Sequence, residues 1–382
     1  MNAVASLLRD LVRLPSVNPM GRPANPEICH EHRMTAYLEG FFKNLGVPYE
    51  KQAMGPGREN IVARHVVPNP TRTIVFEAHQ DTVPVDNMTI EPFGGVIDGN
   101  RLYGRGSCDI KGGMTAMLTA FARLVRERPA AGANVVMACT VDEEHTFKGV
   151  QILVQRGLKA DFAVIAEPTN LNIVHAHKGV VRWFLSTTGR SCHSSSPEKG
   201  INAIYRMGRV LTGIERYAEH LSETIIDPLL GPATISVGIV SGGAAVNTVP
   251  DRCVIEIDRR AVGGEKPLDA PGHLLDFLRK EAGIDFPIEM TPCWIAEPAL
   301  MPLNSEKLVA HLGSAIDQVR GQHRVHAVPY GTDAATIAWS GIPSVVFGPG
   351  DIAQAHTCDE WVPLDEVEQA AEILYAMATR GG

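Results

Sequence analysis

Residues 134–144, NVVMACTVDEE, combine a nearly continuous apolar run with an acidic end. A strand with one face in water alternates apolar and polar residues, whereas a continuous apolar run is typical of a strand that is buried on both faces. Three further runs have this character: TIVF (73–76), FAVIA (162–166) and SVVFG (344–348). The pattern predicts a sheet that is covered on both sides and mainly parallel.

A helical segment lies between TIVF (73–76) and the apolar run that begins at Asn134. In KGGMTAMLTAFARLVRER (111–128) the apolar residues recur with the period of an α-helix. Buried strands that alternate with such helices indicate an α/β fold. We therefore predict a larger α/β domain with a mainly parallel sheet, formed by residues 1–176 and 292–382.

The middle of the chain has a different order of elements. Strand-like and helix-like segments follow one another there as β-α-β-β-α-β, an order typical of two-layer α+β (ferredoxin-like) domains with helices on one face. Residues 177–291 are therefore predicted to form a second domain that is inserted into the first. The segments are 180–189, 201–221, 233–240, 253–260, 267–283 and 286–290.

The composition is that of an ordinary globular enzyme and excludes several partners. Of 382 residues, a length that favours two domains, 45% are hydrophobic and 20% are charged. The net charge is −8 without a basic run, so neither nucleic acid nor an anionic membrane is an expected partner. No apolar run approaches the ~18 residues of a membrane span, and the segment before Pro15 is expected to be an amphipathic helix rather than a signal peptide. Seven cysteines without a CxxC pair favour a reducing cytoplasm.

Acidic and imidazole side chains follow the apolar runs. His79 comes after TIVF, the pair Glu143-Glu144 after NVVMACTV, and Glu167 after FAVIA. Ligands of open α/β sheets gather beyond the carboxyl ends of the strands, so these groups are expected to meet. Taken one at a time, each also fits an ordinary turn, a helix start or an acidic surface loop.

The residue types indicate hydrolytic metal chemistry. Imidazole and carboxylate ligands without cysteine suit two zinc ions, with cobalt or manganese as substitutes. Asp81 lies two residues after His79 and can hold its second ring nitrogen. Of the adjacent Glu143 and Glu144, one can bind metal while the other acts as general base. Asp109 and His356 occupy glycine-containing loops that suit the same site.

Other enzyme classes lack their signatures in this sequence. The glycine-containing segment 104–113, GRGSCDIKGG, matches neither GxxxxGK[ST] nor GxGxxG. A nicotinamide or ATP enzyme is therefore disfavoured. Ser107 is not in a GxSxG nucleophile elbow either.

Five motifs together resemble the M20 family of zinc amidohydrolases and peptidases. They are EAHQDTVP (77–84), YGRGSCDIKGG (103–113), DEE (142–144), AEPT (166–169) and AHTCDE (355–360), in family order and spacing. The family includes acetylornithine deacetylase, succinyl-diaminopimelate desuccinylase, aminoacylase and carboxypeptidase G2. The resemblance covers nearly the whole chain, and it implies that the inserted domain is a lid that mediates dimerisation.

The resemblance implies a role for each residue of the larger domain's site. Asp109 would bridge two zinc ions. His79 and Glu167 would complete one metal site, and Glu144 and His356 the other. Glu143 would be the general base for the water that bridges the ions, and Asp81 would orient His79.

The resemblance also implies roles for residues outside this cluster. His193, in GRSCHSS (189–195), would stabilise the oxyanion, often across the dimer interface. Asn247 and Arg260 would contact the substrate, with Arg260 as a clamp for its carboxylate. Gly331 and Thr332 would line the substrate pocket. Without the resemblance, His193 could cap the following turn and Arg260 could be a solvated strand residue.

Two positions depart from the family pattern. Ile110 stands where Met, Asp or Glu is common, and Glu167 stands where several peptidase branches have Asp. The second departure favours the deacylases over the peptidases. The expected protein is a cytoplasmic, homodimeric dizinc hydrolase that cleaves the amide of an N-acyl amino acid. A dipeptidase or carboxypeptidase of the same family and a catalytically silent metal-binding homologue remain alternatives.

Overall fold

The computed structural model describes residues 2–380. They form two compact units, one of residues 2–175, 302–327 and 332–380 and the other of residues 176–301 and 328–331. The second unit extends past position 291, where the sequence analysis ended the inserted domain, because β15 (Ile295–Glu297) pairs with β9 (Gly179–Thr188) of that unit.

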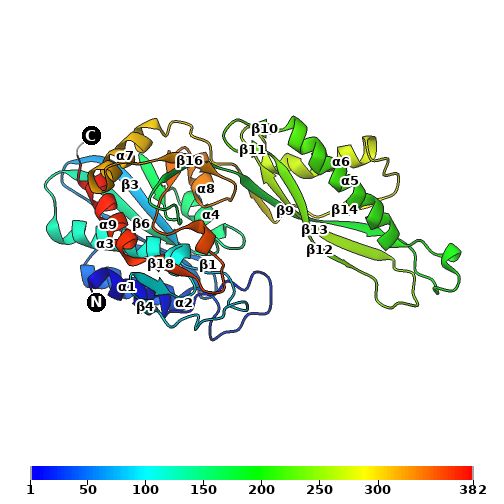
Figure 1. Cartoon of the computed structure of the whole chain (residues 1–382), viewed down its shortest axis with the longest axis horizontal. Coiled ribbons are helices and arrows are strands. Elements are labelled where there is room, and N and C mark those ends of the chain that lie inside the picture. Colours follow the sequence, from blue (N-terminus) through cyan, green and yellow to red (C-terminus); the bar gives the residue numbers. More distant parts are fainter. Residues whose placement is uncertain (1, 381–382) are drawn as a thin grey trace. The chain divides into compact units, whose positions relative to one another are not determined.

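An eight-stranded sheet is the centre of the first unit (Figure 1). Its order is β1-β2-β6-β3-β7-β17-β8-β16, and the four central strands β6, β3, β7 and β17 run parallel. This confirms the α/β prediction, while the pairs β1–β2, β2–β6 and β17–β8 add antiparallel strands. The strands are β1 (Tyr49–Gly55), β2 (Arg58–His65), β3 (Pro70–His79), β6 (Gly132–Thr140), β7 (Phe162–Ile165), β8 (Ile173–His177), β16 (Val325–Val328) and β17 (Ser344–Val346).

Helices cover the sheet on both faces, as continuous apolar strands require. Ile74, Phe76 and Ala78 of β3 join the main core with residues of α1, α2, α3, α7 and α9. The other face contacts α4 and α8. Along β3 the side chains alternate between faces, so His79 lies on the opposite face from Ala78. The helices are α1 (Ala3–Val12), α2 (His32–Leu45), α3 (Gly112–Glu127), α4 (Lys148–Gln155), α7 (Glu306–Arg320), α8 (Ala334–Trp339) and α9 (Leu364–Thr379).

A small antiparallel sheet joins two distant parts of the chain. β5 (Arg101–Tyr103) pairs with β4 (Val96–Asp98) on one side and with β18 (Trp361–Pro363) on the other. The pairing aligns the segment before β18 with the loop that follows β5. That loop leads through the irregular turn η1 (Ser107–Lys111) into α3.

In the second unit β9, α5, β12, β13, α6 and β14 follow the predicted β-α-β-β-α-β order, and β10, β11 and β15 are additional strands. Its sheet is ordered β12-β13-β9-β14, and β15 also pairs with β9. Burial along β13 alternates residue by residue, which is the pattern of a sheet with one covered face. Trp183 and Ile257 lie on that face and pack against α5 and α6. The elements are α5 (Ala203–Thr224), β10 (Ile226–Asp227), β11 (Gly231–Pro232), β12 (Thr234–Gly242), β13 (Arg252–Ala261), α6 (Ala270–Lys280) and β14 (Ile288–Met290), with η2 (Pro197–Lys199) and η3 (Pro267–Asp269).

None of the helices in residues 2–380 has the length and apolar character needed to cross a lipid bilayer.

Candidate metal centre

Three neighbouring strands of the first unit carry site residues at their carboxyl ends. His79 is the last residue of β3, Glu143 and Glu144 follow β6, and Glu167 follows β7. Because β3 lies between β6 and β7, the three ends meet at one edge of the parallel part of the sheet. The residues that the sequence placed at strand ends are therefore close together in space.

Two groups of candidate ligands share one carboxylate. Nε2 of His79 lies 3.2 Å from Oδ1 of Asp109 and 3.8 Å from Oε1 of Glu167. Nε2 of His356 lies 3.2 Å from Oδ2 of Asp109 and 3.3 Å from Oε2 of Glu144. Within each group the ligand atoms all lie within 4.8 Å of one another. Asp109 thus directs one oxygen toward each group.

The charges of the cluster favour cations. Burial, reinforced by the nearby charge of Asp109, raises the pKa of Glu144 to about 7 and that of Glu167 well above its usual range. Contacts with Asp109 and Glu144 raise the pKa of His356 to about 11. Buried carboxylates this close repel one another unless a proton or a metal ion lies between them, so the donor set fits two divalent ions.

The backbone around Asp109 is held by a side chain from a distant segment of the chain. It lies in η1, immediately before α3, where Gly106 adopts a left-handed conformation with φ of 81°. The amide nitrogens of Cys108 and Asp109 donate to the buried carboxylate of Glu360. Sequence reasoning gave Glu360 no role, although it quoted the residue within AHTCDE (355–360).

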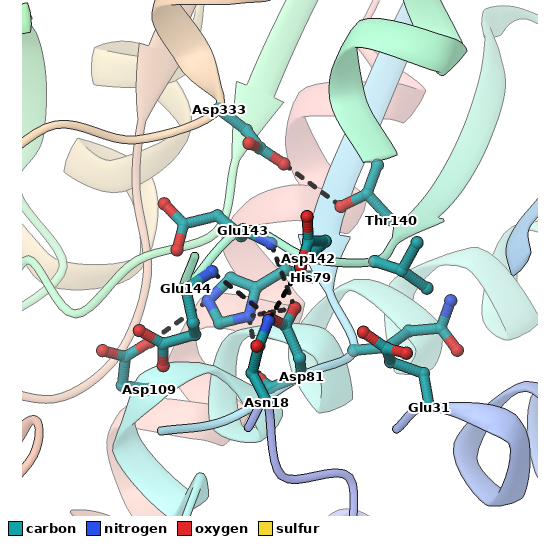
Figure 2. Close-up of polar contacts among 12 residues, drawn as sticks. Asn18, Glu31, His79, Asp81, Asp109, Thr140, Asp142, Glu143, Glu144 and Asp333 are labelled. Carbon is teal, nitrogen blue, oxygen red and sulfur yellow. Dashed lines mark hydrogen bonds and ion pairs between the residues drawn. The ribbon is translucent and has the colours of Figure 1, made fainter. Parts of the chain in front are cut away.

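Asp81 contacts both His79 and the acidic turn after β6. Nδ1 of His79 lies 3.0 Å from the backbone oxygen of Asp81 and 3.6 Å from its carboxylate. The carboxylate accepts hydrogen bonds from the amide nitrogens of Glu143 and Glu144, each at 3.2 Å (Figure 2). Asp81 therefore supports one ligand with its main chain and the turn with its side chain.

Glu143 lies beside the ligand groups but belongs to neither of them. Its side chain is buried, and burial together with the charges of Glu167 and Glu144 raises its pKa well above the usual range. A raised pKa makes a carboxylate a stronger proton acceptor than that of an ordinary glutamate. This environment suits a general base and acid.

A second layer of polar residues lies beneath the turn, and sequence reasoning missed it. The side-chain nitrogen of Asn18 donates to Asp81 at 2.8 Å and to Asp142 at 3.0 Å. Arg58 pairs with the buried Glu31 at 2.5 Å and with Asp142 at 2.9 Å. These contacts join residues that are far apart in the chain, so no local sequence pattern could have predicted them.

A further buried acidic pair lies on the α8 side of the sheet. The hydroxyl of Thr140 is 2.6 Å from Oε1 of Glu77. It is also 3.1 Å from Oδ2 of Asp333 (Figure 2). Burial raises the pKa of Glu77 to about 7. Next to Asp333, the hydroxyl of Thr332 accepts the amide hydrogen of Ala334 at the start of α8, and Thr332 is buried.

The remaining predicted site residues belong to the second unit. His193 is exposed, and its Nδ1 accepts a hydrogen bond from the amide nitrogen of Ser195, as a turn cap would. The backbone oxygen of Asn247 accepts from Ser194, so Asn247 and His193 are neighbours. Gly331 packs against Val180, where a Cβ atom would lie only 2.8 Å from that side chain.

Arg260 is engaged on the uncovered face of the second unit's sheet. Its Nε lies 2.7 Å from Asp258, which also pairs with Arg182 at 2.7 Å. The side chain of Arg260 is 29% exposed, so it is neither fully solvated nor buried.

Comparison with known proteins agrees with the geometry. Residues 75–380 match the family model described as Peptidase family M20/M25/M40. An acetylornithine deacetylase of Myxococcus xanthus is 32% identical over 79% of this chain and 78% of its own length.

Two solved structures share the fold. A metallo-carboxypeptidase of the M20 family from Sulfolobus solfataricus aligns with a TM-score of 0.79 at 20% identity, over 99% of each chain. A dinuclear metal binding peptidase of the M20 family from Bacillus subtilis aligns with a TM-score of 0.71 at 17% identity, over 98% of this chain and 96% of its own. The chain therefore belongs to peptidase family M20/M25/M40 and is a hydrolase of amide bonds.

Proposed function

We propose that this protein removes the acyl group from an N-acyl amino acid by hydrolysing its amide bond. The observation that carries the proposal is the pair of ligand groups that share Asp109, with the buried non-ligand carboxyl group of Glu143 beside them. The similarity to an acetylornithine deacetylase supports a deacylase over a peptidase.

Two divalent metal ions would occupy the cluster. His79, Asp109 and Glu167 would hold one ion, and Asp109, Glu144 and His356 the other. Imidazole and carboxylate donors suit zinc, and cobalt or manganese are substitutes that the same donors accept. When bound, the ions supply Lewis acidity and lower the pKa of water.

The chain's own residues would handle the proton and the geometry. Glu143 takes a proton from the attacking water and then gives it to the leaving amine, and its raised pKa makes its carboxylate a stronger proton acceptor than that of an ordinary glutamate. Asp81 keeps Glu143 in place through the backbone amide of that residue. Because Asp81 holds Glu143 by its main chain, the carboxyl group of Glu143 can turn toward the oxygen of the attacking water or the nitrogen of the leaving amine.

The family resemblance also supports roles for residues outside the metal cluster. His193 donates a hydrogen bond to the developing oxyanion, a role for which its exposed ring suits it. Arg260 binds the substrate carboxylate, and its partner Asp258 orients the guanidinium group. Asn247, Gly331 and Thr332 would line the substrate pocket. Residues 177–291 act in this proposal as a lid.

We also propose a homodimer that forms through this lid. β12 is an end strand of its sheet, and Ile239 and Val240 on it are 59% and 60% exposed. An exposed apolar end strand is a template for pairing with a second copy. The seven free cysteines support a location of the protein in the reducing cytoplasm.

A substrate panel after metal exchange tests the proposal. The chain is stripped with a chelator, loaded with Zn²⁺, Co²⁺ or Mn²⁺, and given N-acetyl amino acids, N-succinyl amino acids and dipeptides. The proposal expects metal-dependent hydrolysis that is fastest with the acylated amino acids. Faster cleavage of dipeptides would make it a peptidase, and no turnover with two ions bound would make it a silent homologue.

A further inference from the structure

The side chain of Glu360 is fully buried and receives four hydrogen bonds. Its Oε1 accepts from the amide nitrogens of Cys108 at 2.9 Å and Asp109 at 3.0 Å. Its Oε2 accepts from the amide nitrogen of Gly106 at 3.0 Å and from Nη1 of Arg105 at 2.7 Å. All four acceptor positions of one carboxylate are therefore used to hold the loop that carries Asp109.

The small antiparallel sheet brings Glu360 to this loop. Trp361 of β18 pairs with Tyr103 of β5, and the amide nitrogen of Gly104 donates to the backbone oxygen of Glu360 at 3.0 Å. The same segment carries His356 four positions earlier. Residues 356–360 therefore contain the candidate ligand His356 and also fix the backbone of Asp109, the ligand that both groups share.

The contacts of Arg105 extend this support to His356. Arg105 is buried and donates from Nη2 to the side-chain oxygen of Asn87 at 3.2 Å. The side-chain nitrogen of Asn87 donates in turn to the backbone oxygen of His356 at 3.2 Å. His356 has a φ of 62°, which is uncommon for a residue other than glycine and requires support from its surroundings.

We propose that Glu360, together with Arg105 and Asn87, is a positioning residue that sets the separation between Asp109 and His356. It thereby controls the affinity of the metal site that these two residues would share with Glu144. The inference rests on the two-metal site proposed above. Glu360 touches neither a metal ligand atom nor the substrate in this role, and it acts through the backbone of the Asp109 loop.

The proposal predicts a specific failure when the carboxylate becomes an amide. In Glu360→Gln the side-chain nitrogen cannot accept a hydrogen bond, so at least two of the four donors lose their partner whichever way the amide is turned. Loss of such outer support typically weakens a metal site by about 10- to 100-fold.

Cobalt binding to the full chain provides the test. Wild type, Glu360→Gln and Glu372→Gln are stripped of metal and titrated with Co²⁺ by calorimetry, while the visible absorption reports the ligand geometry. Glu372 is 60% exposed in a surface pair with Arg123, so its variant carries the same chemical change away from the site. We expect one of the two binding events to weaken about 10- to 100-fold in Glu360→Gln alone, with a changed Co²⁺ spectrum.

The possible results separate the two proposals. A wild-type chain that binds no Co²⁺ would refute the metal site itself. A folded Glu360→Gln variant with wild-type affinities and spectrum would overturn the role of Glu360 and leave the metal site intact. If this variant does not fold, Asn87→Ala replaces it, because Asn87 is exposed and its loss removes the contacts to His356 and to Nη2 of Arg105 while Glu360 keeps its four donors. If both Co²⁺ affinities of Asn87→Ala then equal those of the wild type, the proposal is rejected.

Discussion

Nδ1 of His79 is closer to the backbone oxygen of Asp81, at 3.0 Å, than to the carboxylate of the same residue, at 3.6 Å. The carboxylate instead binds the amide nitrogens of Glu143 and Glu144 and the side chain of Asn18. The expected role of Asp81 toward His79 is therefore shared between main chain and side chain. A substitution at this position acts mainly on the acidic turn.

Asp81→Asn should lower kcat by about 10- to 100-fold while the metal content stays close to two ions per chain. The amide nitrogen cannot accept hydrogen bonds, so the turn that carries Glu143 loses part of its support, whereas the main-chain contact to His79 remains. Steady-state kinetics and elemental analysis of the purified variant measure both quantities. Metal loss as large as in His79→Ala would show that the carboxylate chiefly supports the imidazole.

Glu143→Gln should keep both ions and lose turnover by about 10²- to 10⁴-fold, the usual contribution of a general acid or base. Gln has nearly the same shape as Glu but cannot accept the proton from water. Glu144→Gln is the matched control, because Glu144 belongs to a ligand group and its variant should lose metal. If the Glu143 variant also loses metal, Glu143 is a ligand rather than the base.

Arg58→Met should destabilise the first unit by about 3–5 kcal/mol, because it leaves buried carboxylates without their cation. Arg58 pairs with Glu31 and Asp142, whose side chains are 0% and 2% exposed. Arg64 lies on the same strand and pairs with Glu50 at the surface, so Arg64→Met should cost no more than about 1 kcal/mol. Urea unfolding of the two variants compares them directly, and equal losses would contradict the buried-pair argument.

Acidification should destabilise the second unit through His177. Burial lowers the pKa of this histidine from 6.5 to about 4. Between these values the unfolded chain binds a proton that the folded chain excludes, so the stabilising contribution is complete above pH 6.5 and is lost as the pH falls toward 4. The loss is on the order of 3 kcal/mol.

His177→Gln removes this titration and provides the comparison. Denaturant unfolding of wild type and variant between pH 7 and pH 4.5 measures the dependence. The variant should lose less stability on acidification than the wild type. Parallel curves would mean that His177 is accessible to protons in the folded chain.

The sequence predicted the parts of the structure that depend on local pattern. The four central strands of the first unit appeared as continuous apolar runs, and their carboxyl ends located His79, Glu143, Glu144 and Glu167. The strands β1, β2, β8 and β16 were not predicted. Their residues include several charged or polar positions, such as Glu50 and His175, that give no continuous apolar run.

The supporting residues could not be predicted in the same way. Glu360 acts on a loop that begins at Arg105, and Asn18 bridges Asp81 and Asp142. Such contacts depend on how distant segments meet, and a single buried Glu or Asn has no periodic signature. Asp109 and His356 received their roles from the family resemblance rather than from their own neighbourhoods.

The strand order of the first unit sets a condition on its synthesis. β17 lies between β7 and β8, yet the ribosome makes it only after the whole of residues 176–301. At about 5–20 residues per second, the apolar edge of β7 stays unpaired for on the order of ten seconds. An exposed edge of this kind pairs readily with other nascent chains. Chaperones that bind the nascent chain before β17 is made are therefore the natural route to folded protein, because the vulnerable species is the incomplete chain rather than the finished enzyme.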